Sequence, residues 1–291
     1  MKYFSEFQFT VDENQMPSLL KEIQTAYPDL PDKNMLESVF GFLDLTSLSE
    51  RDNAENISRM CDQVNFLDEG YPGLPSPAAV CVYPALVPIA RAKLSNPLVN
   101  IASVAGGFPS SQTFLEIKLK EVEMALESGA DEIDIVMPVG KFILGLYEEI
   151  YEEIRVIKEI MGNRHLKVIL ETGSLPDLSC VRKASILAMV AGADFIKTST
   201  GKAGEGAKPD SFAIMCFAIK DYYSKTGKKI GIKPAGGIST VESAFEYYSI
   251  VDYILGEEWL TPELFRIGAS RLANALIREL YKKDENFNYF H

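Results

Sequence analysis

The sequence has few of the side chains that most often bind metal ions or form disulfides. It contains two histidines, His165 and His291, and neither has a partner at metal-ligand spacing. The four cysteines fall at no metal-ligand or disulfide-framework spacing, which favours free thiols in a reducing compartment: Cys61, Cys81, Cys180 and Cys216. These absences argue against a histidine metal site and a Ser-His-Asp triad, and we expect neither a metal nor a cofactor.

The sequence also lacks long apolar runs and an excess of basic residues. No stretch approaches the roughly 18 apolar residues of a membrane span. The start, MKYFSEFQFTVDE, lacks the basic and apolar regions of a signal peptide. The formal net charge of −12 argues against binding to nucleic acid, which needs a basic surface. We therefore expect a cytoplasmic protein that binds neither membranes nor nucleic acid, and a homodimer is left open.

What the sequence does contain is a regular alternation of apolar runs and helical periodicity. Its 291 residues are 47% hydrophobic and 24% charged, which is a globular composition. Short apolar runs predict eight strands, at 42–47, 78–84, 100–106, 132–138, 167–173, 194–200, 229–237 and 252–258. The clearest helical segments are 113–128, 146–161, 178–191, 209–223 and 262–280. This alternation predicts an α/β fold, a TIM (β/α)8 barrel. A doubly wound open sheet is the alternative, but no dinucleotide fingerprint follows the first run.

The first part of the chain stands outside this alternation. Helix-like segments at 17–27 and 34–42 flank the turn-prone sequence YPDLPDKN. We expect residues 1–40 to be an N-terminal helical extension that packs on the barrel as a lid or brace. Residues 41–291 then form the barrel and a C-terminal tail.

One predicted strand carries a lysine, within the segment GADFIKTSTGK at 192–202. Strands between helix layers are normally almost continuous apolar runs, and a charge among apolar helices costs several kcal/mol. Because side chains alternate across a strand, Lys197 is expected to point away from the helices into an enclosed polar site. It serves there either in a structural ion pair or as an amine nucleophile.

Polar residues interrupt other predicted strands in the same way. They are Asp44, Thr46, Cys81, Asp134, Glu171 and Lys233. Inward-pointing polar residues near the carboxyl ends of barrel strands are where this fold builds active sites. Simpler interpretations stay open: Asp134 and Lys233 in a buried ion-pair network, Asp44 and Thr46 as turn caps, and Cys81 as a small core residue.

Two lysines and a carboxylate in one site predict imine chemistry. A lysine with a pKa of about 10.4 is roughly 0.04% neutral at pH 7, so lowering its pKa by about 3 units raises the amine fraction about a thousandfold. One lysine therefore attacks a carbonyl while the charge of the other tunes it. A carboxylate such as Asp134, with a water, then moves protons on the adjacent carbon.

Two glycine-containing segments, PAGGIS at 234–239 and RIGASR at 266–271, are expected as the loops after the last two strands. Such loops often bind phosphate in this fold, next to a helix N-terminus. Their glycines allow close backbone approach, and Ser239 and Ser270 offer hydroxyls. The sequence thus predicts a phosphate pocket.

At these residues the sequence resembles the deoxyribose-phosphate aldolase family, class I aldolases that interconvert 2-deoxy-D-ribose 5-phosphate with acetaldehyde and D-glyceraldehyde 3-phosphate. GADFIKTSTGK and GIKPAGGI resemble its lysine motifs, and ADEIDIVMP resembles its aspartate motif. LDLTSL, AAVCVYP, KVILETG and RIGAS follow the family order, so the resemblance covers about 43 to 280. It implies a metal-independent lyase of deoxyribonucleotide catabolism that works through a lysine Schiff base.

The resemblance also implies residue roles. Lys197 is similar to the Schiff-base lysine, Lys233 to the lysine that lowers its pKa, and Asp134 to the proton-transfer aspartate. The expected substrate-binding residues are Thr200, Gly201, Lys202, Gly236, Gly237, Ser270, Asp44, Thr46 and Cys81.

The sequence departs from the family pattern at two places. Ser270 is followed by Arg271 where a second serine is expected, and Tyr289 lies near the end, whereas some members end in a catalytic tyrosine. Two alternative functions stay open: a Schiff-base aldolase for another phosphorylated sugar, and a sugar-phosphate-binding barrel without turnover.

Overall fold

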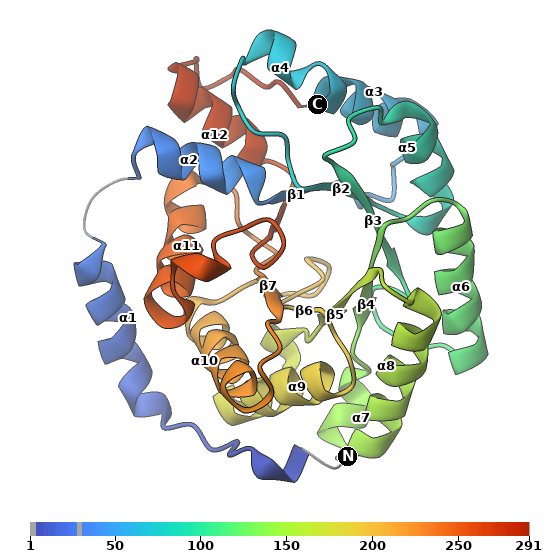
Figure 1. Cartoon of the computed structure of the whole chain (residues 1–291), viewed down its shortest axis with the longest axis vertical. Coiled ribbons are helices and arrows are strands. Elements are labelled where there is room, and N and C mark those ends of the chain that lie inside the picture. The colour runs from blue at the N-terminus through green and yellow to red at the C-terminus, as the bar shows by residue number, and fades with distance from the viewer. Residues whose placement is uncertain (1–3, 28–30, 291) are drawn as a thin grey trace.

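The computed structural model describes residues 4–27 and 31–290, and eight parallel strands lie at its centre (Figure 1). The strands are β1 (Leu43–Thr46), β2 (Ala79–Val82), β3 (Asn100–Ala105), β4 (Glu132–Val136), β5 (His165–Ile169), β6 (Phe195–Lys197), β7 (Gly231–Lys233) and β8 (Ile267–Ala269). The strand order is β7-β6-β5-β4-β3-β2-β1-β8, so each strand lies beside its neighbour in sequence and β8 pairs with β1. This is the order of a barrel.

The barrel closes between β7 and β8 through isolated contacts. Parallel bridges join Ile232 to Phe265 and Ala235 to Gly268. The backbone N–H of Gly268 also donates to the carbonyl of Pro234 at 2.9 Å. The predicted (β/α)8 barrel is therefore confirmed, as a nearly closed barrel.

Helices surround the strands (Figure 1). They are α1 (Met16–Ala26), α2 (Lys33–Gly41), α3 (Ala54–Asn65), α4 (Leu67–Gly70), α5 (Val87–Lys93), α6 (Leu115–Glu127), α7 (Val139–Ile143), α8 (Tyr147–Met161), α9 (Leu178–Val190), α10 (Pro209–Thr226), α11 (Val241–Leu255) and α12 (Leu272–Tyr281). Short 3-10 turns occur at Phe4–Glu6, Glu13–Gln15, Pro84–Leu86, Thr172–Ser174 and Glu257–Trp259. Side-chain caps fix several helix starts: Asp177 accepts the N–H of Cys180, and Thr240 that of Ser243.

The predicted eighth strand, at 252–258, is wrong. Helix α11 continues to Leu255, and a 3-10 turn follows. Its apolar residues pack at helical spacing, because Ile250, Val251, Ile254 and Leu255 are all buried on one side. A short apolar run does not by itself separate a buried helix turn from a strand. The true eighth strand is β8, inside the segment predicted to be a loop, and the helix predicted at 262–280 begins only at α12.

Side chains alternate between two environments across the strands. Ile133 and Ile196 join the large apolar cluster that includes the surrounding helices, whereas their neighbours Asp134 and Lys197 contact each other inside the barrel. The apolar face holds the helices on the barrel. The inner face carries the charged groups together with a small apolar cluster that includes Ala79, Cys81 and Ala102.

The N-terminal segment lies against the outer helices α9, α10 and α11 (Figure 1). The Tyr27 hydroxyl donates to Asp252 at 2.8 Å, and the Val11 N–H donates to the Ser179 hydroxyl at 3.0 Å. The turn predicted at 27–34 includes residues 28–30, which lie outside the described residues. The division of the chain at residue 40 stays a prediction.

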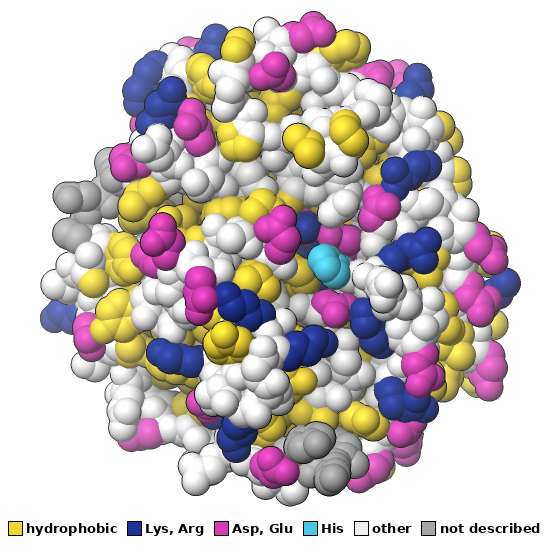
Figure 2. All heavy atoms as spheres, in the orientation of Figure 1, with side chains coloured by type: hydrophobic (Ala, Val, Ile, Leu, Met, Phe, Trp, Pro, Cys, Tyr) yellow, Lys and Arg dark blue, Asp and Glu magenta, His cyan; other side chains and the backbone are white. Residues whose placement is uncertain are grey.

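Acidic and basic side chains are interspersed on the face drawn in Figure 2. Among the described residues, no helix has both the length and the apolar character needed to cross a bilayer.

Candidate active site

The two lysines of the sequence motifs stand side by side at the carboxyl ends of neighbouring strands. Lys197 ends β6, Lys233 ends β7, and the two residues are direct partners in the register of these strands. Each Nζ lies close to the same oxygen, Asp134 Oδ2, at 2.8 Å from Lys197 and 2.9 Å from Lys233. All three side chains are buried. Parallel pairing of two short strands thus places both amines on one carboxylate.

The surroundings give the two amines different properties. Burial lowers the pKa of Lys197 below its usual value, and the charge of Lys233 adds to this effect although Asp134 opposes it. Burial alone would also lower the pKa of Lys233, but the carboxylates of Asp134 and Asp44 outweigh it and raise the pKa. Lys233 therefore stays an ammonium, while the pKa of Lys197 is shifted toward the neutral amine.

Asp134 stays ionised inside the barrel. Burial favours its neutral acid, but the ammonium groups of Lys167, Lys197 and Lys233 hold the pKa of this carboxyl well below its usual range. Its Oδ1 atom lies 3.1 Å from Lys167 Nζ and accepts no hydrogen bond from the described residues. This oxygen therefore faces the Lys167 ammonium.

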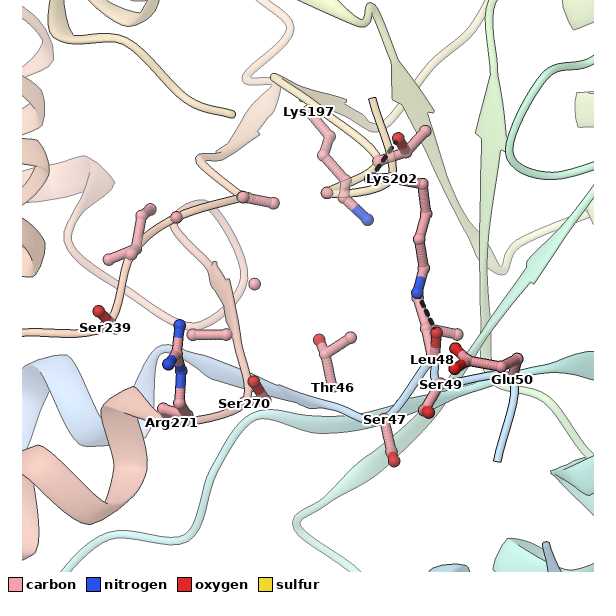
Figure 3. A pocket seen from close by; sticks show the side chains of 18 residues that line it. Thr46, Ser47, Leu48, Ser49, Glu50, Lys197, Lys202, Ser239, Ser270 and Arg271 are labelled. Carbon is pink, nitrogen blue, oxygen red and sulfur yellow. Dashed lines mark hydrogen bonds between the residues drawn. The ribbon is translucent and has the colours of Figure 1, made fainter. Parts of the chain in front are cut away.

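A pocket of about 380 Å³ opens at the carboxyl ends of the strands, and the Lys197 side chain points into it (Figure 3). Thr46, Lys202, Ser270 and Arg271 also line it. They come from three segments that are far apart in the sequence, and the barrel brings them together. This is the end of the barrel where the fold builds active sites.

The loop after β6 is held by a buried carboxylate. The N–H and hydroxyl of Thr200 donate to Glu171 at 3.2 and 2.6 Å, and the Lys202 N–H donates to the Thr200 hydroxyl at 3.0 Å. Glu171 itself adopts a left-handed backbone conformation, with φ 53 and ψ 57, which residues other than glycine rarely take. The Lys202 ammonium donates to the carbonyl of Leu48 across the pocket mouth. These contacts fix the loop on one side of the pocket.

The loop after β7 requires glycine for close packing. A Cβ on Gly236, whose φ is +89, would lie 2.9 Å from the Cα of Gly206. A Cβ on Gly206 would lie 2.2 Å from the carbonyl oxygen of Gly236. The two loops therefore touch through backbone alone, and Gly237 in the same loop also has a positive φ, +85.

Ser270 and Arg271 lie between β8 and the first residue of α12. Both side chains are exposed and line the pocket (Figure 3). The free N–H groups and partial positive charge of a helix start favour an anion, and the guanidinium adds a full charge. This side of the pocket is suited to a phosphate group.

The other predicted site residues lie in different positions. Thr46 lines the pocket, and its hydroxyl donates to the Asp44 carbonyl at 2.8 Å. Asp44 is fully buried below the pocket and bonds Lys233 and Arg266. Cys81 is fully buried in a small inner apolar cluster, where burial raises the pKa of its thiol.

The tail tyrosine, Tyr289, packs in the outer layer. Its hydroxyl donates to the Gln63 carbonyl at 2.8 Å, and its ring lies against Tyr71. Asn274 accepts its backbone N–H at 2.9 Å. In this structure Tyr289 is not among the residues that line the pocket.

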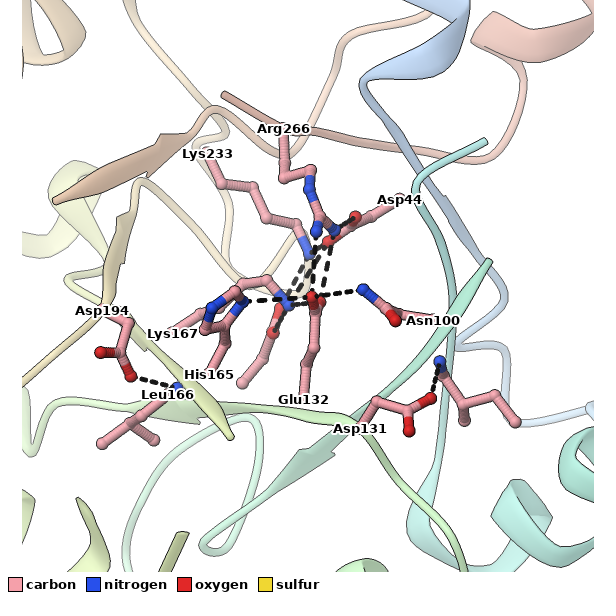
Figure 4. A network of polar contacts seen from close by, with 12 residues as sticks. Asp44, Asn100, Asp131, Glu132, His165, Leu166, Lys167, Asp194, Lys233 and Arg266 are labelled. Atoms are coloured by element: carbon pink, nitrogen blue, oxygen red, sulfur yellow. Dashed lines mark hydrogen bonds and ion pairs between the residues drawn. The ribbon is translucent and has the colours of Figure 1, made fainter. Parts of the chain in front are cut away.

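Sequence reasoning missed a second layer of charged residues beneath the lysine pair: Glu132, Lys167 and Arg266 (Figure 4). Two of them could have been found by alternation. Glu132 stands two residues before Asp134 on the same strand, and Lys167 lies between the apolar residues of β5. Arg266 lay in a segment predicted to be a loop. Within the described ranges, no group of three or more His, Cys, Asp or Glu side chains is arranged to hold a metal ion.

Comparison with known proteins gives a consistent class. A family model described as DeoC/LacD family aldolase matches residues 39–253. The chain is 45% identical over 254 residues to the human deoxyribose-phosphate aldolase, covering 82% of this chain and 79% of that protein. It is 42% identical over 275 residues to the mouse deoxyribose-phosphate aldolase, covering 91% and 84%. The solved deoxyribose phosphate aldolase of Aeropyrum pernix is similar with a TM-score of 0.65 and 26% identity, over 88% of this chain and 96% of that chain.

Fold and site together define a barrel enzyme of the aldolase class, because a buried amine pair lies beneath a pocket at the carboxyl ends of the strands. The chain belongs to the DeoC/LacD aldolase family. It is a lyase, and the resemblance found in its lysine and aspartate motifs is confirmed.

Proposed function

We propose that this aldolase cleaves 2-deoxy-D-ribose 5-phosphate reversibly into acetaldehyde and D-glyceraldehyde 3-phosphate, as a step of deoxyribonucleotide catabolism in the cytoplasm. The observation that carries the proposal is the lysine pair, in which two buried amines share one carboxylate oxygen and their pKa values are shifted in opposite directions, down for Lys197 and up for Lys233. The names of the human and mouse relatives support the substrate.

The reaction begins at Lys197. Its neutral amine adds to the C1 aldehyde of the open-chain sugar, and loss of water gives an iminium. The C2–C3 bond then breaks, and its electron pair moves toward the iminium nitrogen to form an enamine. The C3 hydroxyl loses its proton, so that D-glyceraldehyde 3-phosphate leaves. Protonation of the enamine at C2 and hydrolysis by water release acetaldehyde and restore the amine.

Asp134 moves the protons in this scheme. It accepts hydrogen bonds from both lysines through Oδ2, and its Oδ1 atom accepts none from the described residues. A bridging water connects this carboxylate with the C3 hydroxyl and with C2. Lys233 remains charged throughout and stabilises Asp134 whenever that carboxylate is ionised.

The phosphate binds at the far side of the pocket from Lys202. The backbone of Gly236 and Gly237, the Ser270 hydroxyl and the Arg271 guanidinium line that side. Thr200, Gly201 and Lys202 contact the sugar hydroxyls on the opposite wall. Arg271 replaces a hydroxyl donor with a charged one, which suits a dianionic phosphate.

Reductive trapping tests the proposal. Borohydride in the presence of acetaldehyde should leave a stable mass increment on the peptide that contains Lys197, and a coupled assay should detect D-glyceraldehyde 3-phosphate from the sugar phosphate. Lys197→Arg is the matched control and should lose both signals. An adduct found only on Lys233 or Lys202 would overturn the assignment. Turnover of a different phosphorylated acceptor, without cleavage of this sugar, would overturn the substrate.

A further inference from the structure

The lysine pair lies beside a layer of charged side chains inside the barrel (Figure 4). Lys167, from the middle of β5, is completely buried and lies against three carboxylates. Its Nζ contacts Glu132 Oε2, lies 3.1 Å from Asp134 Oδ1 and lies 3.7 Å from Asp44 Oδ2. Those carboxylates outweigh burial, which alone would lower the pKa of Lys167, and they raise it. Lys167 is thus a permanent cation.

Arg266 completes this layer from the other side. Its guanidinium donates to Asp44 Oδ1 at 2.7 Å and to Glu132 Oε1 at 2.9 Å. Glu132 therefore bridges Arg266 and Lys167, and Asp44 bridges Arg266 and Lys233. Every member is buried, so water screens these charges very little. The geometry of each group depends on the others.

The layer is electrically balanced without Lys197. Its cations are Lys167, Lys233 and Arg266, and its anions are Asp44, Glu132 and Asp134. A protonated Lys197 would add a charge with no anion of its own. Asp134, its direct partner, is already shared with two other ammonium groups. An unpaired charge in such surroundings is strongly disfavoured.

We propose that Lys167 is a positioning residue for the reaction, which pairs with Asp134 from below and so keeps the Lys197 amine free to attack. This inference rests on the proposed imine chemistry at Lys197. It adds a residue that the two-lysine scheme does not include. It also makes the whole charged layer, and not Lys233 alone, responsible for the protonation state of the Lys197 amine. Glu132 holds Lys167 in place, and Arg266 in turn holds Glu132.

The ionisable groups around Lys197 show which of them can transmit the influence of Lys167 to its amine. The ionisable groups that face it from neighbouring elements are Asp134, Lys233 and Cys81, with Glu50, Lys202 and Arg271 across the pocket. Lys167 lies at Asp134 Oδ1, whereas Lys197 bonds Asp134 Oδ2. The influence of Lys167 passes through Asp134, because each ammonium beside that carboxylate weakens the stabilisation that the carboxylate gives to the other ammonium groups.

Two single substitutions test the proposal because they must act in opposite directions. Lys167→Met leaves Asp134 with one cation fewer, so the Lys197 ammonium is stabilised. The acid limb of the kcat/KM–pH profile, where activity falls as Lys197 is protonated, then moves to higher pH. Glu132→Gln leaves Lys167 more dependent on Asp134, so the limb moves to lower pH. We expect each shift to be about one pH unit, which is about tenfold in kcat/KM on the acid side of the limb.

The double variant Lys167→Met/Glu132→Gln removes one charge of each sign. Its limb should return close to the wild-type position, whereas a merely structural role predicts that the two losses add. The exposed pair Lys120 and Glu123 on α6, 3.2 Å apart, gives matched control variants Lys120→Met and Glu123→Gln that should leave the limb in place. Circular dichroism checks the fold of each variant.

The outcomes separate this inference from the proposed function. If wild-type protein traps acetaldehyde on Lys197 but the limb does not move in opposite directions, Lys167 has no tuning role and the aldolase assignment stands. If wild-type protein traps nothing, the imine chemistry itself fails. Should Lys167→Met not fold, Glu132→Gln still decides, because an unmoved limb or a shift to higher pH overturns the proposal.

Discussion

Lys197 and Lys233 share one carboxylate oxygen, yet their pKa values move in opposite directions. The difference comes from their other contacts. Lys233 has Asp44 as a second carboxylate, whereas Lys197 faces the pocket and has only its share of Asp134. Two identical side chains on neighbouring strands thereby differ in the charge they favour, which is the difference that the proposed amine nucleophile and fixed cation require.

Lys233→Leu should remove the fixed cation and leave Asp134 to stabilise the Lys197 ammonium. The pKa of Lys197 then rises toward an ordinary lysine value, and only the neutral amine attacks. A rise of about 3 units lowers activity at neutral pH about a thousandfold, and activity returns as the pH approaches about 10. Measuring kcat and KM from about pH 6 to about pH 10 checks this.

The control for that experiment is Lys233→Arg, which keeps the charge. It should preserve the neutral-pH limb better than the leucine variant, provided that circular dichroism shows both folded. A leucine variant with a normal kcat, a raised KM and no recovery at high pH would show that Lys233 only grips the substrate.

Asp134→Asn should separate imine formation from proton transfer. The amide keeps the size of the side chain but neither carries the charge nor accepts a proton. We expect acetaldehyde still to be trapped on Lys197, while turnover falls by about 10²- to 10⁴-fold. Exchange of the methyl protons of acetaldehyde in deuterated water, followed by nuclear magnetic resonance, should slow in parallel. Unchanged exchange would move the proton-transfer role to another group.

Arg271→Ser should weaken phosphate binding without changing the chemistry. The exposed guanidinium lines the pocket beside Ser270 and takes no part in the proposed imine chemistry. We expect KM for the sugar phosphate to rise about tenfold with kcat nearly unchanged, consistent with the loss of one charge-assisted hydrogen bond. Unphosphorylated deoxyribose should show no such difference. Lys93→Ser, on the outer helix α5, is the matched control.

Chelation should leave activity intact. The proposed electron sink is the iminium on Lys197, and the described residues offer no cluster suited to a metal ion. Activity measured after EDTA and dialysis is therefore expected to equal that of untreated protein. Loss of activity that returns with a divalent cation would contradict the imine mechanism.

The sequence was sufficient for the parts of the fold that follow from strand alternation. Lys197 stands out because it breaks an apolar run, and Asp134 because it lies between two isoleucines. The barrel follows from the count of such runs. The eighth strand could not be located this way, because the end of α11 is as apolar as a strand and β8 has three residues with a glycine in the middle.

Lys167 was missed for a related reason. The predicted strand began at this residue, whereas β5 starts at His165 and places Lys167 in its centre. An error of two residues at a strand boundary hid an interior charge. The partners of such a charge come from other strands, and only the closed barrel brings Glu132 to Lys167 and Arg266 to Glu132.

The pairing of β6 with β7 makes the proposed chemistry depend on which face of each strand its lysine occupies. Each strand has three residues, and each lysine directly follows the isoleucine that packs against the helices. Inserting or deleting one residue upstream within either strand would exchange these two faces, turning the amine outward and an apolar side chain inward. The barrel outline could survive such an exchange, but the reactive pair could not. Length variation compatible with activity is therefore confined to loops and helices, or to even steps within the strands.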